Sequence, residues 1–225
     1  MSCEHATNRV PARYRQVLRG ASRALASHRG WDPGAIELAR RLARCFGAPL
    51  HIARASRLVV DTNRSEDHPR VFSEWSRRLA PSERTRALDE LWRPHRSAVE
   101  ASVRARAACA ATHVSVHSFT PRLDGRTRTV DIGLLFDPAR AREVALVDAW
   151  IAALGPRLPG LRIHRNRPYR GTSDGLTTAL RKELGGRLYA GIEVEISQRI
   201  VRGDAARWRS AQRAVIDSLA DALRC

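Results

Sequence analysis

The chain has 225 residues, of which 43% are hydrophobic and 28% are charged. This composition is typical of a soluble globular protein, and the length suits one domain over residues 1–225 with a full hydrophobic core. No stretch reaches the roughly 20 apolar residues of a membrane span, and the first residues do not resemble a signal peptide. We therefore expect a cytoplasmic protein with no membrane partner.

The net charge of +17 comes almost entirely from arginine, since Lys182 is the only lysine. Basic proteins can bind nucleic acid through phosphate contacts. Here the arginines are spread over every segment, and aromatic residues make up only 5% of the chain, so no stacking pattern accompanies them. A compositional bias towards arginine explains the charge at least as well, and we do not expect a nucleic-acid partner. The four cysteines form no CxxC pair, which argues against a disulfide framework or a cysteine-rich zinc site.

The spacing of apolar residues predicts the secondary structure in chain order. Two amphipathic helices are predicted at 12–28 and 35–46, followed by short strands at 49–53 and 58–61 and a long helix at 82–108. The second half predicts strands at 113–117, 130–136, 161–164 and 188–196 and helices at 139–154 and 204–223. This alternation predicts an α/β fold with a mostly parallel sheet and helices on both faces.

Polar side chains stand at or near the ends of several predicted strands. In open α/β sheets, ligands bind beyond the carboxyl ends of the strands. The residues in such positions are His5, Asp61, His117, Asn166 and Glu195. Each of them has an ordinary structural explanation, such as a histidine hydrogen-bonded at a strand end. Their shared placement on one rim is more informative than any single residue.

Three acidic residues leave alternatives open. Asp32 precedes Pro33 and a helix, so it is either an N-cap or a metal ligand. Glu193 and Glu195 share one face of a strand whose other face is apolar. They either pair with nearby arginines or supply a general base with a raised pKa, and the spacing favours neither interpretation.

The tetrapeptide at 61–64 is another candidate. It follows an apolar run and ends in Asn63-Arg64. An arginine beside an asparagine is well suited to holding a carboxylate through two parallel hydrogen bonds, although a solvated turn would show the same residues.

Seven segments together resemble the N-formylglutamate amidohydrolase family, in its shorter branch. They occur in the family's order and cover nearly the whole chain, at residues 2–11, 28–35, 60–64, 114–121, 131–137, 166–171 and 191–196. The family is similar in architecture to zinc carboxypeptidases and aspartoacylase. The resemblance implies a three-layer α/β/α fold with a mixed, mostly parallel sheet and one zinc ion at the strand ends.

The resemblance also implies roles for individual residues. His5 and His117 would be zinc ligands, and Glu195 would be the general base. The third ligand is open: relatives have a glutamate three residues after the first histidine, where this chain has Asn8, a weaker ligand. We therefore favour Asp32.

The same resemblance assigns the substrate carboxylate to Asn63 and Arg64, and we expect Asn166 and Tyr169 to line the pocket. The apolar strand that usually precedes the first motif is nearly absent here. We therefore expect His5 to be held less firmly than His117.

These observations predict a zinc-dependent amidohydrolase that cleaves the amide bond of an N-acyl (N-formyl) amino acid such as N-formylglutamate. Another divalent ion would suit the same donors, and we expect a monomer that acts on a small molecule. The alternative is a non-catalytic α/β binding protein with a degenerate metal site that associates with acidic partners. Neither the acyl group nor the amino acid follows from the sequence.

Overall fold

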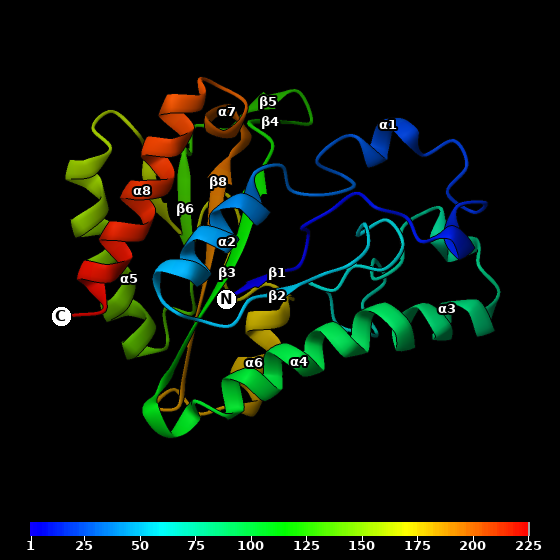
Figure 1. Ribbon diagram of the computed structural model, residues 1–225, viewed down its shortest axis with the longest axis horizontal. Helices are drawn as coiled ribbons and strands as arrows, with labels where there is room; N and C mark the ends of the chain where they lie inside the picture. Colours follow the sequence, from blue (N-terminus) through cyan, green and yellow to red (C-terminus); the bar gives the residue numbers. More distant parts are fainter. Residues whose placement is uncertain (225) are drawn as a thin grey trace.

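The computed structural model describes residues 1–224, and Cys225 lies outside the described part. Its centre is a sheet of six strands in the order β2–β1–β3–β8–β6–β7 (Figure 1). Neighbouring strands run parallel except for β6 and β8, so the predicted mixed, mostly parallel sheet is confirmed. The strands are β1 (Ser2–Cys3), β2 (His51–Ile52), β3 (Ala111–Phe119), β6 (Ile132–Leu135), β7 (Ile163–Arg165) and β8 (Tyr189–Ser197). A separate hairpin joins β4 (Arg122–Leu123) to β5 (Arg126–Thr127).

Helices cover both faces of this sheet and give the three-layer arrangement that the sequence predicts. One face packs against α2 (Ala35–Cys45), α5 (Ala141–Leu154) and α8 (Ala205–Ala222). The other face packs against α4 (Arg93–Arg104) and α6 (Leu176–Glu183). Figure 1 shows the two helix groups on opposite sides of the strands. The short helices are α1 (Ser22–Leu25), α3 (Pro81–Ala87) and α7 (Gln198–Val201).

The two longest strands, β3 and β8, pair over nine residues at the centre of the sheet. Because side chains alternate along a strand, Val114 and Val116 enter the core under α2, α5 and α8. The intervening residues face the α4 and α6 layer. Near the start of the strands that layer is apolar, but towards their carboxyl ends it is polar, which places the candidate site there.

The long helix predicted at 82–108 is interrupted. A π-helical turn at Leu88–Trp92 separates α3 from α4. Pro94 has no backbone N–H and cannot donate to the carbonyl of Glu90, so a wider turn at this point is expected.

Two other predictions in the first half are wrong. Residues 12–28 form only a 3-10 turn at Ala12–Tyr14 and the single turn α1. Residues 58–61 form no strand, although Val59 is fully buried. These apolar side chains pack into two small clusters beneath irregular chain, so burial without regular structure produced the misleading pattern. The helix α6 was not predicted.

The start of the chain is firmly held. The strand β1 has only two residues, but it lies between β2 and β3 and pairs with both. The amino group of Met1 donates to the carbonyl of Pro49 at 3.0 Å, and Cys3 is fully buried in the main core. No helix among residues 1–224 is long and apolar enough to span a bilayer.

Candidate metal centre and active site

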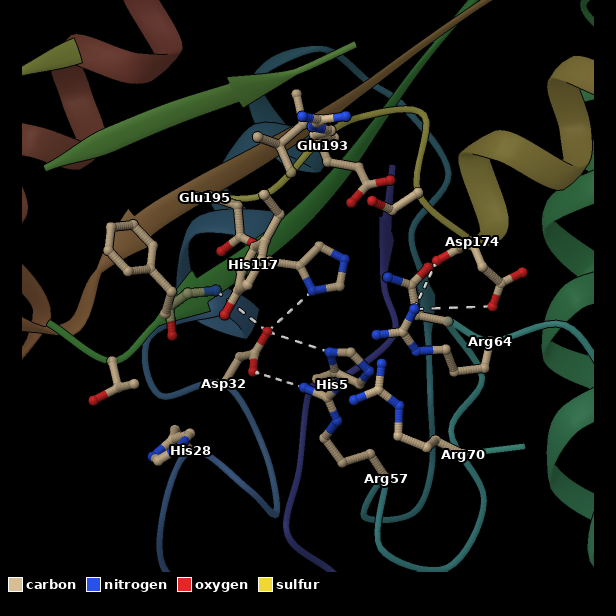
Figure 2. A pocket seen from close by; sticks show the side chains of 18 of the residues that line it. His5, His28, Asp32, Arg57, Arg64, Arg70, His117, Asp174, Glu193 and Glu195 are labelled. Atoms are coloured by element: carbon tan, nitrogen blue, oxygen red, sulfur yellow. Dashed lines mark hydrogen bonds and ion pairs between the residues drawn. The ribbon is translucent and has the colours of Figure 1, made fainter. Parts of the chain in front are cut away.

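Three buried side chains meet beyond the carboxyl ends of the central strands (Figure 2). His5 follows β1, Asp32 precedes α2, and His117 lies near the end of β3; each is 2–3% exposed. The Nδ1 atoms of His5 and His117 lie 3.3 and 3.0 Å from the same oxygen, Asp32 Oδ2. One ligand atom from each residue lies within 4.8 Å of the others, so the group could hold a metal ion.

Asp32 is positioned for this site and not for helix capping. The N-cap of α2 is Gly34, which has a φ of +79° that suits glycine, and no side chain caps this helix. The Asp32 N–H donates to the His5 carbonyl at 2.9 Å, and its Oδ2 accepts from the Ser118 N–H at 3.3 Å. Asn8, the alternative ligand, is exposed and does not line the cavity.

Each of the two histidines also contacts a second carboxylate, through its Nε2 atom. The Nε2 atom of His5 lies 2.7 Å from Asp61 Oδ1, and the Nε2 atom of His117 lies 3.1 Å from Glu4 Oε2. Ser115 donates to the same Glu4 oxygen at 2.6 Å. Such partners orient ligand histidines and fix which nitrogen faces a metal. Here they leave both Nδ1 atoms directed at the space beside Asp32.

The charges of this group are strongly coupled. Burial alone would raise the pKa of Asp32, but the neighbouring His5 and His117 outweigh it and hold the pKa below its usual range. Burial alone would lower the pKa of His117, but hydrogen bonds to Asp32 and Glu4 raise it well above the ordinary value. A protonated His117 therefore balances two buried carboxylates in the protein without an ion, and a cation between the Nδ1 atoms would take over that balance.

Glu195 is the nearest unpaired acid. It lies opposite His117 in the register of β3 and β8 and is 5% exposed. Burial raises its pKa to about 8; His117 opposes this shift, and the negative charges of Asp32 and Glu193 add to it. Its Oε2 atom is buried without a hydrogen-bond partner among the described residues. Neither Glu195 nor Glu193 forms an ion pair with an arginine in that part of the chain, so the arginine-pairing interpretation fails for both.

The cavity beside the centre has a volume of about 630 Å³ and contains the expected carboxylate-binding pair. The Nη1 atom of Arg64 donates to the Asp174 carbonyl at 3.0 Å, and Asn63 Oδ1 accepts from the Leu176 N–H at 2.9 Å. These bonds fix both side chains on the wall of the cavity. The 61–64 segment is therefore partly buried and ordered by tertiary contacts.

Of the two further residues expected to line the cavity, Tyr169 does and Asn166 has a different environment. The Tyr169 hydroxyl accepts from Arg128 Nη1 at 2.9 Å. Asn166 adopts a φ of +51°, and its Oδ1 accepts from the N–H groups of Phe136 and Gly171 at 3.0 and 2.9 Å. It holds the turn that carries Tyr169.

Arg57 belongs to the site but was not predicted. Its Nη2 lies 2.9 Å from Asp61 Oδ2, and its Nη1 lies 3.7 Å from Asp32 Oδ1. Nothing in the local sequence distinguishes it from the other arginines, because its role depends on two acids that come from separate loops.

The fold and the site together define a class: an α/β protein with a buried histidine–aspartate–histidine group that could bind a metal at the carboxyl edge of its sheet. The sequence profile of the family described as N-formylglutamate amidohydrolase matches residues 1–202. The chain therefore belongs to this family of amidohydrolases, and the resemblance found in the sequence is confirmed.

Solved structures agree with this assignment. A gene product from Agrobacterium tumefaciens is 30% identical, with a TM-score of 0.83 over 99% of this chain and 89% of that chain. An N-formylglutamate amidohydrolase from Ralstonia eutropha JMP134 is 19% identical, with a TM-score of 0.72 over 99% of this chain and 93% of that one, and supports the fold. The comparison with curated proteins finds no match.

Proposed function

We propose that this protein is a metal-dependent hydrolase that cleaves the amide bond of an N-acyl amino acid, with N-formyl amino acids such as N-formylglutamate as the first substrates to test. One observation carries the proposal. A buried pair of histidines with Asp32 lies beside Glu195, whose Oε2 has no hydrogen-bond partner among the described residues, in a cavity that also contains Arg64.

The donor set suits Zn²⁺, which prefers nitrogen and oxygen ligands in sites with three protein groups and one open position. His5 and His117 would bind through Nδ1, since their Nε2 atoms are engaged by Asp61 and Glu4. When bound, such an ion supplies Lewis acidity: it polarises a carbonyl and makes water acidic enough to lose a proton near neutral pH. Other divalent ions would also suit these donors.

Glu195 supplies the general base. No donor within residues 1–224 engages its Oε2, so this atom is available to accept a proton from water and return it to the leaving amine. A pKa of about 8 keeps its proton in place at neutral pH in the metal-free protein, and a nearby dication would lower that pKa into the working range. A bound dication would therefore favour the ionised form of Glu195, which is the form that accepts a proton.

The arginines supply orientation and charge. Arg64, with Asn63 beside it, would hold the substrate carboxylate and fix the amide relative to Glu195. Arg57 is anchored by Asp61 next to Asp32, where its guanidinium would stabilise the negative charge that develops on the carbonyl oxygen.

The test is Glu195→Gln in zinc-loaded protein. We expect unchanged zinc content and a fall in kcat of about 10²–10⁴-fold on N-formyl amino acids, because only proton transfer is lost. Glu66→Gln, which removes an exposed charge outside the cavity, is the matched control and should retain activity. Near-full activity of Glu195→Gln would contradict the assigned base. Failure of the wild type to take up any divalent metal would favour the non-catalytic binding protein.

A further inference from the structure

The cavity contains a second buried carboxylate that the proposed mechanism does not use. Glu193 lies two residues before Glu195 on the same face of β8, is 8% exposed, and lines the cavity. Because β8 ends at the rim, Glu193 lies one step deeper than Glu195. Figure 2 shows it between Glu195 and Asp174, on the side of the cavity where Arg64 lies.

Contacts from α6 hold Glu193 in this position. Its Oε1 accepts a hydrogen bond from the Thr177 hydroxyl, in the first turn of α6, where the helix dipole favours negative charge. Gly175 precedes that turn, and a Cβ there would lie 3.5 Å from Glu193 Oε1 and 3.2 Å from Asn63 Oδ1. Glu193 and Asn63 therefore flank one glycine, so Glu193 stands next to the proposed carboxylate-binding pair.

Glu193 has fewer hydrogen-bond donors than the three acids that contact the histidines of the site. Glu4, Asp32 and Asp61 each contact at least two donors. Within the described residues, only Thr177 donates to Glu193, and no arginine, lysine or histidine forms an ion pair with it. A buried carboxylate with a single hydrogen-bond donor is stabilised by a second one. Because Glu193 lines the cavity, a ligand bound there could supply that second donor.

We infer that Glu193 selects the side chain of the amino acid in the substrate, and that this side chain carries an N–H donor, as a carboxamide or a guanidinium does, and not a carboxylate. The inference rests on the proposed hydrolysis of N-acyl amino acids. A substrate whose α-carboxylate is held by Asn63 and Arg64 would have its side chain within reach of Glu193, because Glu193 and Asn63 lie on either side of Gly175. An acidic side chain would meet a buried like charge there.

Arg70 and Arg170, which form no ion pair within residues 1–224, also line the cavity, but their surroundings differ from those of Glu193. Arg70 and Arg170 are exposed, so water and salt screen their charges, whereas Glu193 is buried. The exposed arginines would attract any ligand that carries a carboxylate, including all N-acyl amino acids. Discrimination between side chains then depends on the buried group.

The experiment compares N-formyl-L-glutamine, N-formyl-L-arginine and N-formyl-L-glutamate on zinc-loaded wild type and Glu193→Gln. We expect the wild type to favour at least one of the two donor substrates over N-formyl-L-glutamate by at least about tenfold in kcat/KM. The isosteric Gln keeps an oxygen for Thr177 and offers an N–H₂ to the cavity. It should reduce or reverse that preference, by raising kcat/KM for the glutamate derivative. Glu66→Gln is the control for the loss of one negative charge and should preserve the wild-type ratio.

Binding of the free amino acids to the same proteins, measured by calorimetry, gives a readout that does not depend on turnover. We expect glutamine or arginine to bind wild type more tightly than glutamate, and Glu193→Gln to narrow the difference. Turnover with glutamate preferred by both proteins would overturn the inference alone. Absence of turnover on every substrate, with zinc bound, would overturn the proposed function and the inference with it.

Discussion

The two ends of β3 each bury a histidine on the same face of the strand, but with opposite charge behaviour. His113 and His117 are both 2% exposed. Burial lowers the pKa of His113 to about 3, and the positive amino terminus adds to this shift. The pKa of His117 is raised well above its ordinary value by Asp32 and Glu4, against the effect of burial. The two histidines are therefore equally buried, and the neighbouring groups determine whether the pKa is lowered or raised.

The partners explain the difference. His113 contacts two hydroxyl groups, Ser2 Oγ at 2.7 Å and Tyr189 OH at 2.9 Å, which satisfy a neutral imidazole. His117 contacts carboxylates through both ring nitrogens. At one end of the strand a histidine is thus packed between two hydroxyl groups, and at the other end the histidines and Asp32 form a group that could hold a cation. Carboxylate partners, and not burial, distinguish the histidine of the candidate metal site from the structural histidine in this sheet.

The largest expected change in stability comes from removing His117, the charged histidine near the carboxyl end of β3. In the metal-free protein, His117→Ala leaves Glu4 and Asp32 buried without their shared donor. The free energy of unfolding should fall by about 3–5 kcal/mol, as it does when one partner of a buried ion pair is removed. Urea unfolding of chelator-treated protein at neutral pH measures this loss.

The control for that experiment is His28→Ala. His28 also lines the cavity, but it is only partly buried and forms no hydrogen bond or ion pair within residues 1–224. Its replacement should change stability by no more than about 0.5 kcal/mol. Equal effects of the two substitutions would mean that His117 is not the balancing charge of the centre.

A smaller change in stability, confined to acid pH, is expected at His113, near the start of β3. The pKa of His113 is about 3 in the folded protein and about 6.5 when unfolded, so only the unfolded chain binds this proton between those values. The contribution of His113 to stability is complete above pH ~6.5 and is lost as the pH falls towards 3, by up to about 1.4 kcal/mol per pH unit. His113→Gln should make the dependence of unfolding free energy on pH shallower in this window.

Tyr189→Phe separates titration from hydrogen bonding at the same place. It removes one hydroxyl partner but keeps the imidazole, so it should lower stability by about 1 kcal/mol at neutral pH and leave the acid slope steep. If His113→Gln kept the wild-type slope between pH 6.5 and 3, the neutral, buried state assigned to His113 would be wrong.

The contrast between His113 and His117 also explains which features could be predicted from the sequence. The strands β3 and β8 and the helices α2, α5 and α8 follow from periodicity, because each buries one regular face. His117 was found as a polar residue at a strand end. Its distinction from His113 was not visible, because Glu4 and Asp32 reach it from segments 113 and 85 residues earlier in the chain.

The irregular first half was the hardest part to predict. The expected weakness of β1 did not allow for its place between β2 and β3, which gives its two residues partners on both sides. Arg57 and the buried run before Asp61 carry no local signal, since their order comes from loops that pack against one another. Tertiary contacts, and not propensity, build this side of the centre.

The last set of substitutions tests whether the carboxylates that contact the histidine Nε2 atoms tune the centre. Glu4→Gln and Asp61→Asn each keep the shape of the side chain but remove the charge next to one histidine Nε2. Each should weaken zinc binding about 10–100-fold, measured by competition with a chelator at fixed pH. Ser115→Ala, which removes only a hydroxyl bonded to Glu4, should weaken it by less than tenfold. Because His5 and His117 depend on different carboxylates, the double substitution should approach the product of the two single effects. If Glu4→Gln left zinc affinity unchanged while Asp61→Asn lowered it, the raised pKa of His117 would come from Asp32 alone, and the contrast along β3 would depend on that one residue.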